Sequence, residues 1–345
     1  MSDMLTSKKR KVLIYGFSVT AESPGYVGPL IKLLSDFDLV KVGNGGIQPH
    51  HALFYIVDEI KKHAPDELIL EFSTAAFRSF YDKNEYKKIL FFICSAAIKL
   101  GVRPHILDLP RSDVSYDNDW VLNFHRCLSQ QYGIGWVDVC TESFRSGAIS
   151  GYLRDGIHTN ELGANYYSSV LSEYFLDSIA TNASSLPVSP ISNFGADMLD
   201  CARAVSLASL AENSSLEYFE RSGFEGTFLP IDVGQEIRVS FSETLNVKGV
   251  SFLMGPLTSS FHLDFGGCTR SVNAYDRFCY YTRFSVQCFD NLSAASVIIR
   301  SDENRSDVVL LKGVEESPVK NYLGDILVLS NQYDEIKLPN DYLAA

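Results

Sequence analysis

The sequence lacks a long apolar run and lacks an excess of basic residues. No apolar stretch reaches the roughly 18–20 residues that a membrane-spanning helix needs. Acidic residues (42) outnumber basic residues (30), which gives a formal net charge of −12. A surface of this sign repels phosphate backbones. The sequence therefore predicts neither a membrane span nor nucleic acid as a partner.

Paired cysteine motifs are also missing. The seven cysteines form no Cys-x-x-Cys pair, a pattern typical of reduced thiols rather than of disulfides or structural zinc. The basic cluster Lys8–Lys11 is followed by only four apolar residues, fewer than the about 7–15 of a signal-peptide core. We therefore expect a cytoplasmic protein without metal or cofactor.

The first half of the chain alternates short apolar strands with amphipathic helices. Strands are expected at 11–15, 39–42, 67–71, 104–109 and 134–139, and helices at 25–34, 51–62, 85–100, 120–132 and 162–179. This alternation predicts an α/β domain over residues 1–180, with a parallel sheet covered by helices on both faces. We expect the flavodoxin-like strand order 2-1-3-4-5.

The second half has a different pattern. A polar, Ser/Pro-rich stretch begins at residue 181 and suggests a connecting segment over 181–214, although its later part could be helical. From residue 215 to 345, short runs alternate apolar and polar residues between turn signals. This pattern is typical of a mostly antiparallel β-sandwich.

Four motifs carry the chemistry, and each follows a predicted strand or precedes the last helix of the first domain. They are Gly16-Phe17-Ser18, Asn44-Gly45-Gly46, Glu71-Phe72-Ser73-Thr74 and Asp155-Gly156-Ile157-His158. Ligands of open α/β sheets bind outside the carboxyl ends of the strands, near the point where strand order reverses. We therefore expect these motifs to meet at one crevice.

The residue types suit acyl transfer. A serine hydroxyl needs a base within hydrogen-bond reach, and the base needs an acceptor that orients it. His158 is the candidate base for Ser18, and Asp155 is the candidate acceptor for the other ring nitrogen. Glycines without a Cβ let backbone N–H groups approach a developing oxyanion. Gly46 and the N–H of Ser18 are the candidate donors.

The segments VLIYGFSVT, VGNGGI and DGIHTNELGANYYS resemble the first, second and fifth blocks of the SGNH (GDSL-like) hydrolases, over residues about 11–180. The resemblance implies a Ser18–His158–Asp155 triad and an oxyanion hole that includes the amides of Ser18 and Gly46. Phe17 stands where the family usually has Asp. The third block also departs from the family, because no asparagine is present. The hydroxyl of Ser73 or Thr74 could supply the missing donor.

Each motif also has a plainer interpretation. Ser18 could cap a helix, Asp155 and His158 could form a solvated turn, and Gly46 could shape a loop. Glu71 could be a site carboxylate, a helix cap or a partner of Arg78. Adjacent residues face different directions on a helix, so His50-His51 suggests a surface or capping role rather than a metal site.

The sequence thus predicts a serine esterase that hydrolyses small acyl esters, acetyl esters above all, with an O-acetylated carbohydrate as the preferred substrate. One alternative is an O-acyltransferase in which a glycan hydroxyl replaces water. The other is a catalytically silent glycan-binding protein that keeps the fold. The sequence carries no signal for the oligomeric state.

Overall fold

The computed structural model describes residues 9–75, 78, 82–180, 185–210, 216–276, 281–302 and 319–338. The chain divides into two compact units. The first comprises residues 1–52, 56–196 and 336–345, and the second comprises 53–55 and 197–335. No helix in the described ranges is long and apolar enough to cross a membrane.

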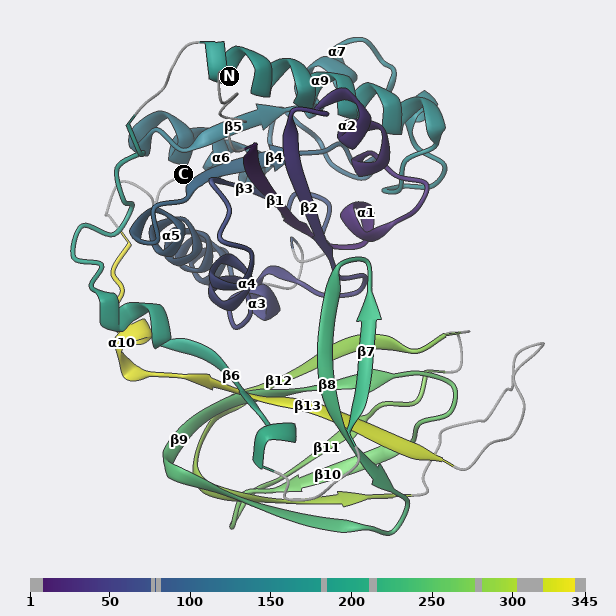
Figure 1. The fold of residues 1–345 in the computed structure, drawn as a ribbon, viewed down its shortest axis with the longest axis vertical. Helices are drawn as coiled ribbons and strands as arrows, with labels where there is room; N and C mark the ends of the chain where they lie inside the picture. Colours follow the sequence, from purple (N-terminus) through teal and green to yellow (C-terminus); the bar gives the residue numbers. More distant parts are fainter. Residues whose placement is uncertain are drawn as a thin grey trace, which may run out of the picture. The chain divides into compact units, whose positions relative to one another are not determined.

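The first unit is built on a five-stranded parallel sheet (Figure 1). Its strands are β1 (Arg10–Gly16), β2 (Phe37–Gly43), β3 (Glu67–Glu71), β4 (Arg103–Asp108) and β5 (Gly135–Asp138). Their order is β2-β1-β3-β4-β5, so the predicted flavodoxin-like α/β class is confirmed. Because helices cover both faces of the sheet, most residues of β1 are buried.

Helices α2 (Val27–Leu33) and α9 (Glu161–Ala180) pack together against one face of this sheet. Helices α4 (Ile56–His63), α5 (Lys83–Lys99) and α6 (Trp120–Tyr132) lie on the other face. The carboxylates of Asp82 and Asp119 cap the first turns of α5 and α6 by accepting from backbone N–H groups. The short helices are α1 (Ser18–Ala21), α3 (Pro49–Ala52), α7 (Cys140–Arg145) and α8 (Ile149–Tyr152).

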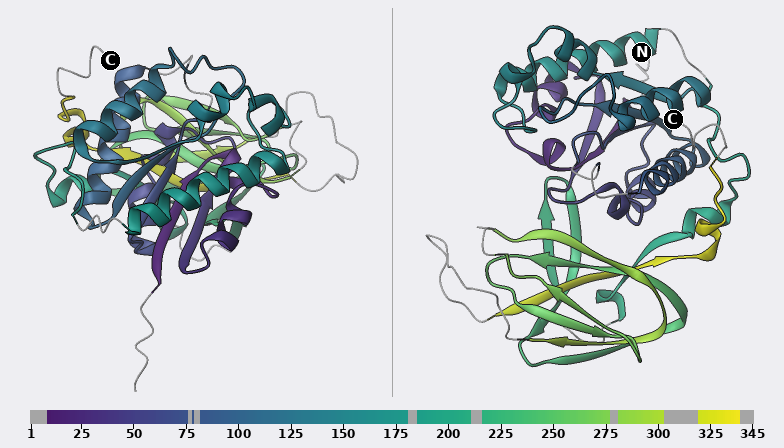
Figure 2. Two further views of the ribbon diagram at one scale, coloured as in Figure 1. Left: turned by 90° about the horizontal axis from the view of Figure 1, so that it is seen from above. Right: turned by 180° about the vertical axis from the view of Figure 1, so that it is seen from behind.

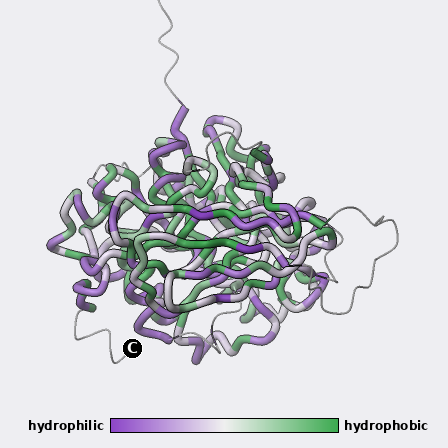
Figure 3. The backbone as a smooth tube through the Cα atoms, turned by 90° about the horizontal axis from the view of Figure 1, so that it is seen from below, coloured by the Kyte–Doolittle hydropathy of each residue, from purple (hydrophilic) through white to green (hydrophobic). Residues whose placement is uncertain are grey.

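The second unit is an antiparallel sheet that curls around its own core (Figure 2). Its strands are β6 (Ala202–Ser206), β7 (Glu217–Arg221), β8 (Phe224–Asp232), β9 (Glu236–Met254), β10 (Ser260–Asp264), β11 (Thr269–Asn273), β12 (Arg283–Ser301) and β13 (Lys320–Leu329), followed by helix α10 (Asn331–Asp334). The long pair β9 and β12 bends at two breaks in register. Hydrophobic and hydrophilic residues are interspersed along this unit (Figure 3), and burial alternates residue by residue along β10, as expected for a sheet with one face on the core.

The expected connecting segment 181–214 contains more structure than its composition suggested. Its described part includes the 3₁₀ turns Ala196–Asp200 and Ala208–Leu210, with β6 between them. Strand β6 pairs with β13, as Val205 with Ile326 illustrates. The Ala- and Leu-rich stretch that could have been helical is therefore a strand over Ala202–Ser206 between two 3₁₀ turns, because distant pairing outweighs local propensity.

Candidate active site

Three of the four predicted motifs begin at the same edge of the parallel sheet. Gly16, the last residue of β1, is level with Gly43 on one side and with Glu71 on the other. Both glycines are required by close packing of α1. A Cβ on Gly16 would lie 2.2 Å from Thr20 Oγ1, and one on Gly43 would lie 2.5 Å from the Cα of Ala21. Helix α1 therefore rests directly on the ends of β1 and β2.

Ser18 is the first residue of α1 and is partly buried. Phe17 precedes it and stacks on Phe72, with ring centroids 5.0 Å apart, so the strand-to-helix turn is held by aromatic packing. The second motif approaches the serine, because a Cβ on Gly45 would lie 4.0 Å from Ser18 Cβ. Gly46 is exposed and has a φ of +84°, a conformation that favours glycine. The structure thus brings Ser18 and the Asn44-Gly45-Gly46 turn together.

Asp155 and His158 form the hydrogen bond that the sequence predicted. His158 Nδ1 lies 2.9 Å from Asp155 Oδ2, and Asp155 Oδ1 accepts from the backbone N–H groups of Ile157 and His158. Burial alone would raise the pKa of Asp155, but these backbone hydrogen bonds and the His158 side chain outweigh burial and lower the pKa to about 2. Because Asp155 is ionised at neutral pH, Nδ1 of His158 carries the proton and donates it. In this tautomer Nε2 carries the lone pair of the neutral ring.

The loop that carries Asp155 and His158 is hydrogen-bonded to the end of α1. Glu22, the C-cap of α1, accepts from the N–H and the hydroxyl of Thr159, the residue after His158. Glu22 also pairs with Arg154 at 2.7 Å. Within the described residues, no hydrogen bond joins Ser18 to His158. Glu22 is not predictable from the sequence, because no local signal links it to a residue as distant in the chain as Thr159.

Ser73 lies next to the site, but its hydroxyl is hydrogen-bonded to backbone groups at the end of β4. Ser73 is fully buried, and Leu109 N–H donates to its Oγ at 2.8 Å. The hydroxyl in turn donates to the carbonyls of Leu107 and Leu109. An oxyanion role for Ser73 would require its hydroxyl to leave these partners. The following residue, Thr74, directs its hydroxyl to Glu71.

Glu71 is a fully buried carboxylate at the carboxyl end of β3. It accepts from the side chain and the backbone N–H of Thr74 and from the hydroxyl of Thr20. Burial raises the pKa of Glu71 to about 7, against the lowering effect of these hydrogen bonds. Arg78, one of the partners considered from the sequence, pairs with Asp119 at 2.8 Å.

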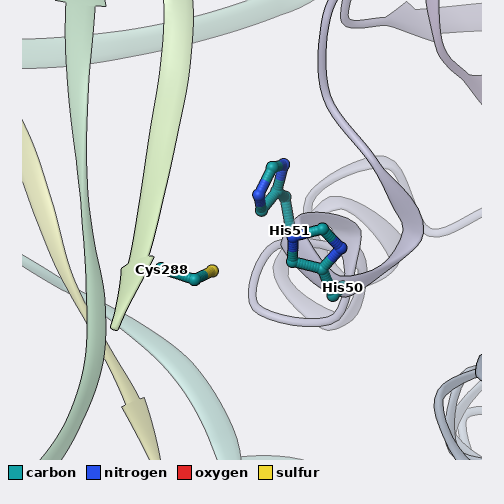
Figure 4. Close-up of side chains that lie close together, drawn as sticks. All are labelled: His50, His51 and Cys288. Atoms are coloured by element: carbon teal, nitrogen blue, oxygen red, sulfur yellow. The ribbon is translucent and has the colours of Figure 1, made fainter. Parts of the chain in front are cut away.

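His50 and His51 lie side by side on α3, with ring centroids 3.8 Å apart (Figure 4). The expectation that the two rings face apart is therefore wrong. The expected capping role is confirmed for His51, whose Nδ1 accepts from the N–H of Gln48. Burial lowers the pKa of His50 to about 4, and burial together with His50 lowers the pKa of His51. Both imidazoles are therefore neutral at pH 7.

No protein-family model matches this chain, and no curated protein matches it in sequence. Among solved structures, a two-domain esterase (CEX) active on acetylated mannans is similar, with 15% identity, a TM-score of 0.63, and coverage of 93% of this chain and 91% of that one. The chain shares the fold of a two-domain esterase. The same esterase co-crystallised with mannopentaose gives a TM-score of 0.59 at 14% identity, covering 93% and 90%.

An acetyl xylan esterase, AlAXEase, is similar to the first unit alone. It is 17% identical, has a TM-score of 0.41, and the match covers 47% of this chain and 98% of that one. At these identities the two-domain esterase fold is shared, and the chemistry must be argued from the site residues.

Proposed function

We propose that this protein is a serine esterase that hydrolyses small acyl esters with a Ser18–His158–Asp155 triad. The observation that carries the proposal is the 2.9 Å bond between His158 Nδ1 and the ionised Asp155, on a loop fastened to the helix of Ser18. This bond fixes the ring tautomer in which Nε2 is the free base. The approach of Gly45 to Ser18, with Gly46 as the next residue along the turn, supports an oxyanion hole there.

In the first step, Ser18 Oγ attacks the ester carbonyl carbon while its proton passes to His158 Nε2. The carbonyl electron pair moves onto the oxygen, and the N–H groups of Ser18 and Gly46 stabilise that oxyanion. Asp155 stabilises the imidazolium that forms. When the tetrahedral intermediate collapses, the ester C–O bond breaks and the leaving alkoxide takes the proton from His158. The products of this step are an alcohol and an acyl-Ser18 ester.

Water completes the reaction. His158 Nε2 takes a proton from a water molecule as its oxygen attacks the acyl-Ser18 carbonyl carbon. Collapse of the second tetrahedral intermediate breaks the bond to Ser18 Oγ, which regains its proton from His158. The acid leaves, and the enzyme returns to its starting protonation state.

For the substrate, we propose an acetyl group on a carbohydrate. The support is the fold shared along 93% of the chain with an esterase described as active on acetylated mannans. This support is an analogy between folds. The buried, engaged hydroxyl of Ser73 favours a second candidate, a silent glycan-binding protein, because it leaves the oxyanion hole with fewer donors.

The test measures acetate released from an O-acetylated mannan, with and without a deacetylated mannan acceptor. We expect acetate release by the wild type and loss of release in Ser18→Ala. Ser169→Ala serves as the matched control, because Ser169 is exposed on α9. Acetyl appearing on the acceptor would instead favour an acyltransferase. Unchanged acetate release in Ser18→Ala, or mannan binding without any release, would contradict the proposed esterase.

A further inference from the structure

Glu71 is a buried carboxylate that the triad does not use. It lies at the carboxyl end of β3, level with Gly16, and its side chain is inaccessible to solvent. A charge in such a place is costly unless hydrogen bonds satisfy it. Thr74 donates from its hydroxyl at 2.7 Å and from its backbone N–H at 3.2 Å, both to Oε1. Thr20 Oγ1 donates to Oε2 at 3.2 Å.

These donors come from segments that surround Ser18. Thr20 belongs to α1, and Thr74 belongs to the loop after β3. The backbone of Phe17, the residue directly before Ser18, also lowers the pKa of Glu71. The carboxylate of Glu71 thus links two segments by hydrogen bonds. One is the helix α1 that begins at Ser18, and the other is the loop after β3.

A third segment joins through Thr20. The hydroxyl of Tyr26, in the residue before α2, lies 3.0 Å from Thr20 Oγ1. Since Thr20 donates its own proton to Glu71, Tyr26 donates to Thr20. The resulting chain of hydrogen bonds runs from Tyr26 through Thr20 to Glu71. All three side chains are fully buried, so none of these bonds competes with water.

We propose that Glu71 is a positioning residue, which as a carboxylate holds the Phe17–Ser18 turn in the geometry needed for nucleophilic attack. The inference rests on the proposed role of Ser18. As an ionised carboxylate, Glu71 accepts from Thr74 at Oε1 and from Thr20 at Oε2. A protonated carboxyl group would carry a donor on one oxygen, so a threonine hydroxyl would have to turn from donor to acceptor. Protonation therefore changes the hydrogen bonds that hold the turn.

The groups that face Glu71 in the described residues are neutral. They are the hydroxyl groups of Thr20 and Thr74 and the backbone of Phe17, with the phenol of Tyr26 behind Thr20. Burial, and then the charge of Glu71, raises the pKa of Tyr26, so it stays protonated in the neutral range. The pKa of about 7 for Glu71 places its own ionisation where activity is measured. The ionisation of Glu71 therefore adds a second titration to the acidic side of the profile of kcat against pH.

The test compares Glu71→Gln with the wild type, using p-nitrophenyl acetate across pH 5–9. Glutamine keeps the size of the side chain but replaces one acceptor oxygen with an NH₂ donor. We expect kcat at pH 8 to fall by about 10-fold or more, with KM within about 2-fold, because the serine is misplaced while the binding surface is kept. Labelling of Ser18 by a fluorophosphonate should slow by a similar factor. The acidic limb should lose one ionisation, and Glu71→Asp should restore part of the rate.

Glu67→Gln is the matched control. Glu67 is a buried carboxylate at the other end of β3, bonded to His105, so it reports the loss of a buried charge away from Ser18. If Glu71→Gln does not fold, Thr20→Val removes a single donor, and kcat should fall by about 3-fold or more.

Unchanged kcat and an unchanged acidic limb in a folded Glu71→Gln or Thr20→Val would overturn the role of Glu71. So would equal effects of Glu67→Gln on kcat and on the acidic limb. Full activity of Ser18→Ala would instead overturn the proposed function, whatever the Glu71 variants do. The two failures are therefore distinguishable.

Discussion

Glu22 and Thr159 are 137 positions apart in the sequence and are joined by two hydrogen bonds to the same carboxylate oxygen. Glu22 ends the helix that Ser18 begins, and Thr159 follows His158. The pair therefore connects the two candidate residues through four residues of backbone on the Ser18 side and one on the His158 side. Glu22 is nearly buried, and Arg154 balances its charge.

Glu22→Ala should lower kcat/KM for p-nitrophenyl acetate. Without Glu22, the His158 loop loses its fixed distance from α1, and small misplacements of a base cost up to about 100-fold in rate. The free energy of unfolding should fall by about 1–3 kcal/mol, because the buried Thr159 N–H loses its acceptor. Glu161→Ala is the control, since Glu161 is an exposed carboxylate at the start of α9. Equal activity of the two variants would contradict the positional role of Glu22.

Asp155→Asn should lower kcat by about 10³–10⁴-fold with little change in KM. Asparagine keeps an oxygen for the backbone N–H groups of Ile157 and His158. Its NH₂ group would face Nδ1, however, and would move the imidazole proton to Nε2, which then cannot act as the base. Steady-state kinetics with an activated acetyl ester measures the effect. A loss smaller than about 10-fold would show that the Asp155–His158 bond does not set the tautomer.

Ser73→Ala distinguishes a structural hydroxyl from an oxyanion donor. The substitution leaves the buried N–H of Leu109 without its acceptor, so the free energy of unfolding should fall by about 1–3 kcal/mol. Because the hydroxyl bonds to the sheet edge, we expect kcat of the folded variant to stay within about 3-fold of the wild type, whereas loss of an oxyanion donor costs about 10²–10³-fold. Denaturant unfolding and kcat, measured on the same preparation, decide between the two roles.

Glu71 should make stability depend on pH. Its pKa is raised from 4.5 to about 7 in the folded protein, so between these values the folded state holds a proton that the unfolded state has lost. This contribution to stability is fully present below pH 4.5 and is lost as pH rises to about 7, by up to about 3 kcal/mol. Denaturant unfolding of the wild type and of Glu71→Gln over pH 4.5–8 checks this. The difference between them should change in this window, and a constant difference would contradict the raised pKa.

The order of the parallel sheet was predictable from local patterns. Each strand of the first unit is an apolar run followed by a helix, and right-handed crossovers leave few ways to arrange such units. The predicted strand 67–71 matches β3 at both ends. The hydrogen bond between Asp155 and His158 was also predictable, because the two residues are three positions apart in one turn.

What the sequence did not predict depends on pairing between distant segments. Glu22 meets Thr159, and Ser73 meets Leu109, only after the sheet has formed. Strand β6 was not predicted because the pairing of residues such as Val205 with β13 decides its conformation. The conformation of His50 and His51 depends on the hydrogen bond from the Gln48 N–H to His51. The general rule that adjacent helical residues point in different directions takes no account of such a bond.

The most direct test of the central claim is to label the protein with a fluorophosphonate and to identify the modified peptide by mass spectrometry. We expect a single phosphonylated residue, Ser18, because only an activated serine reacts with such a probe. Labelling should be lost in His158→Asn and retained in the control variant Ser169→Ala. Absence of labelling at Ser18 in the folded wild-type protein, or equally fast labelling in His158→Asn, would contradict nucleophilic catalysis by Ser18.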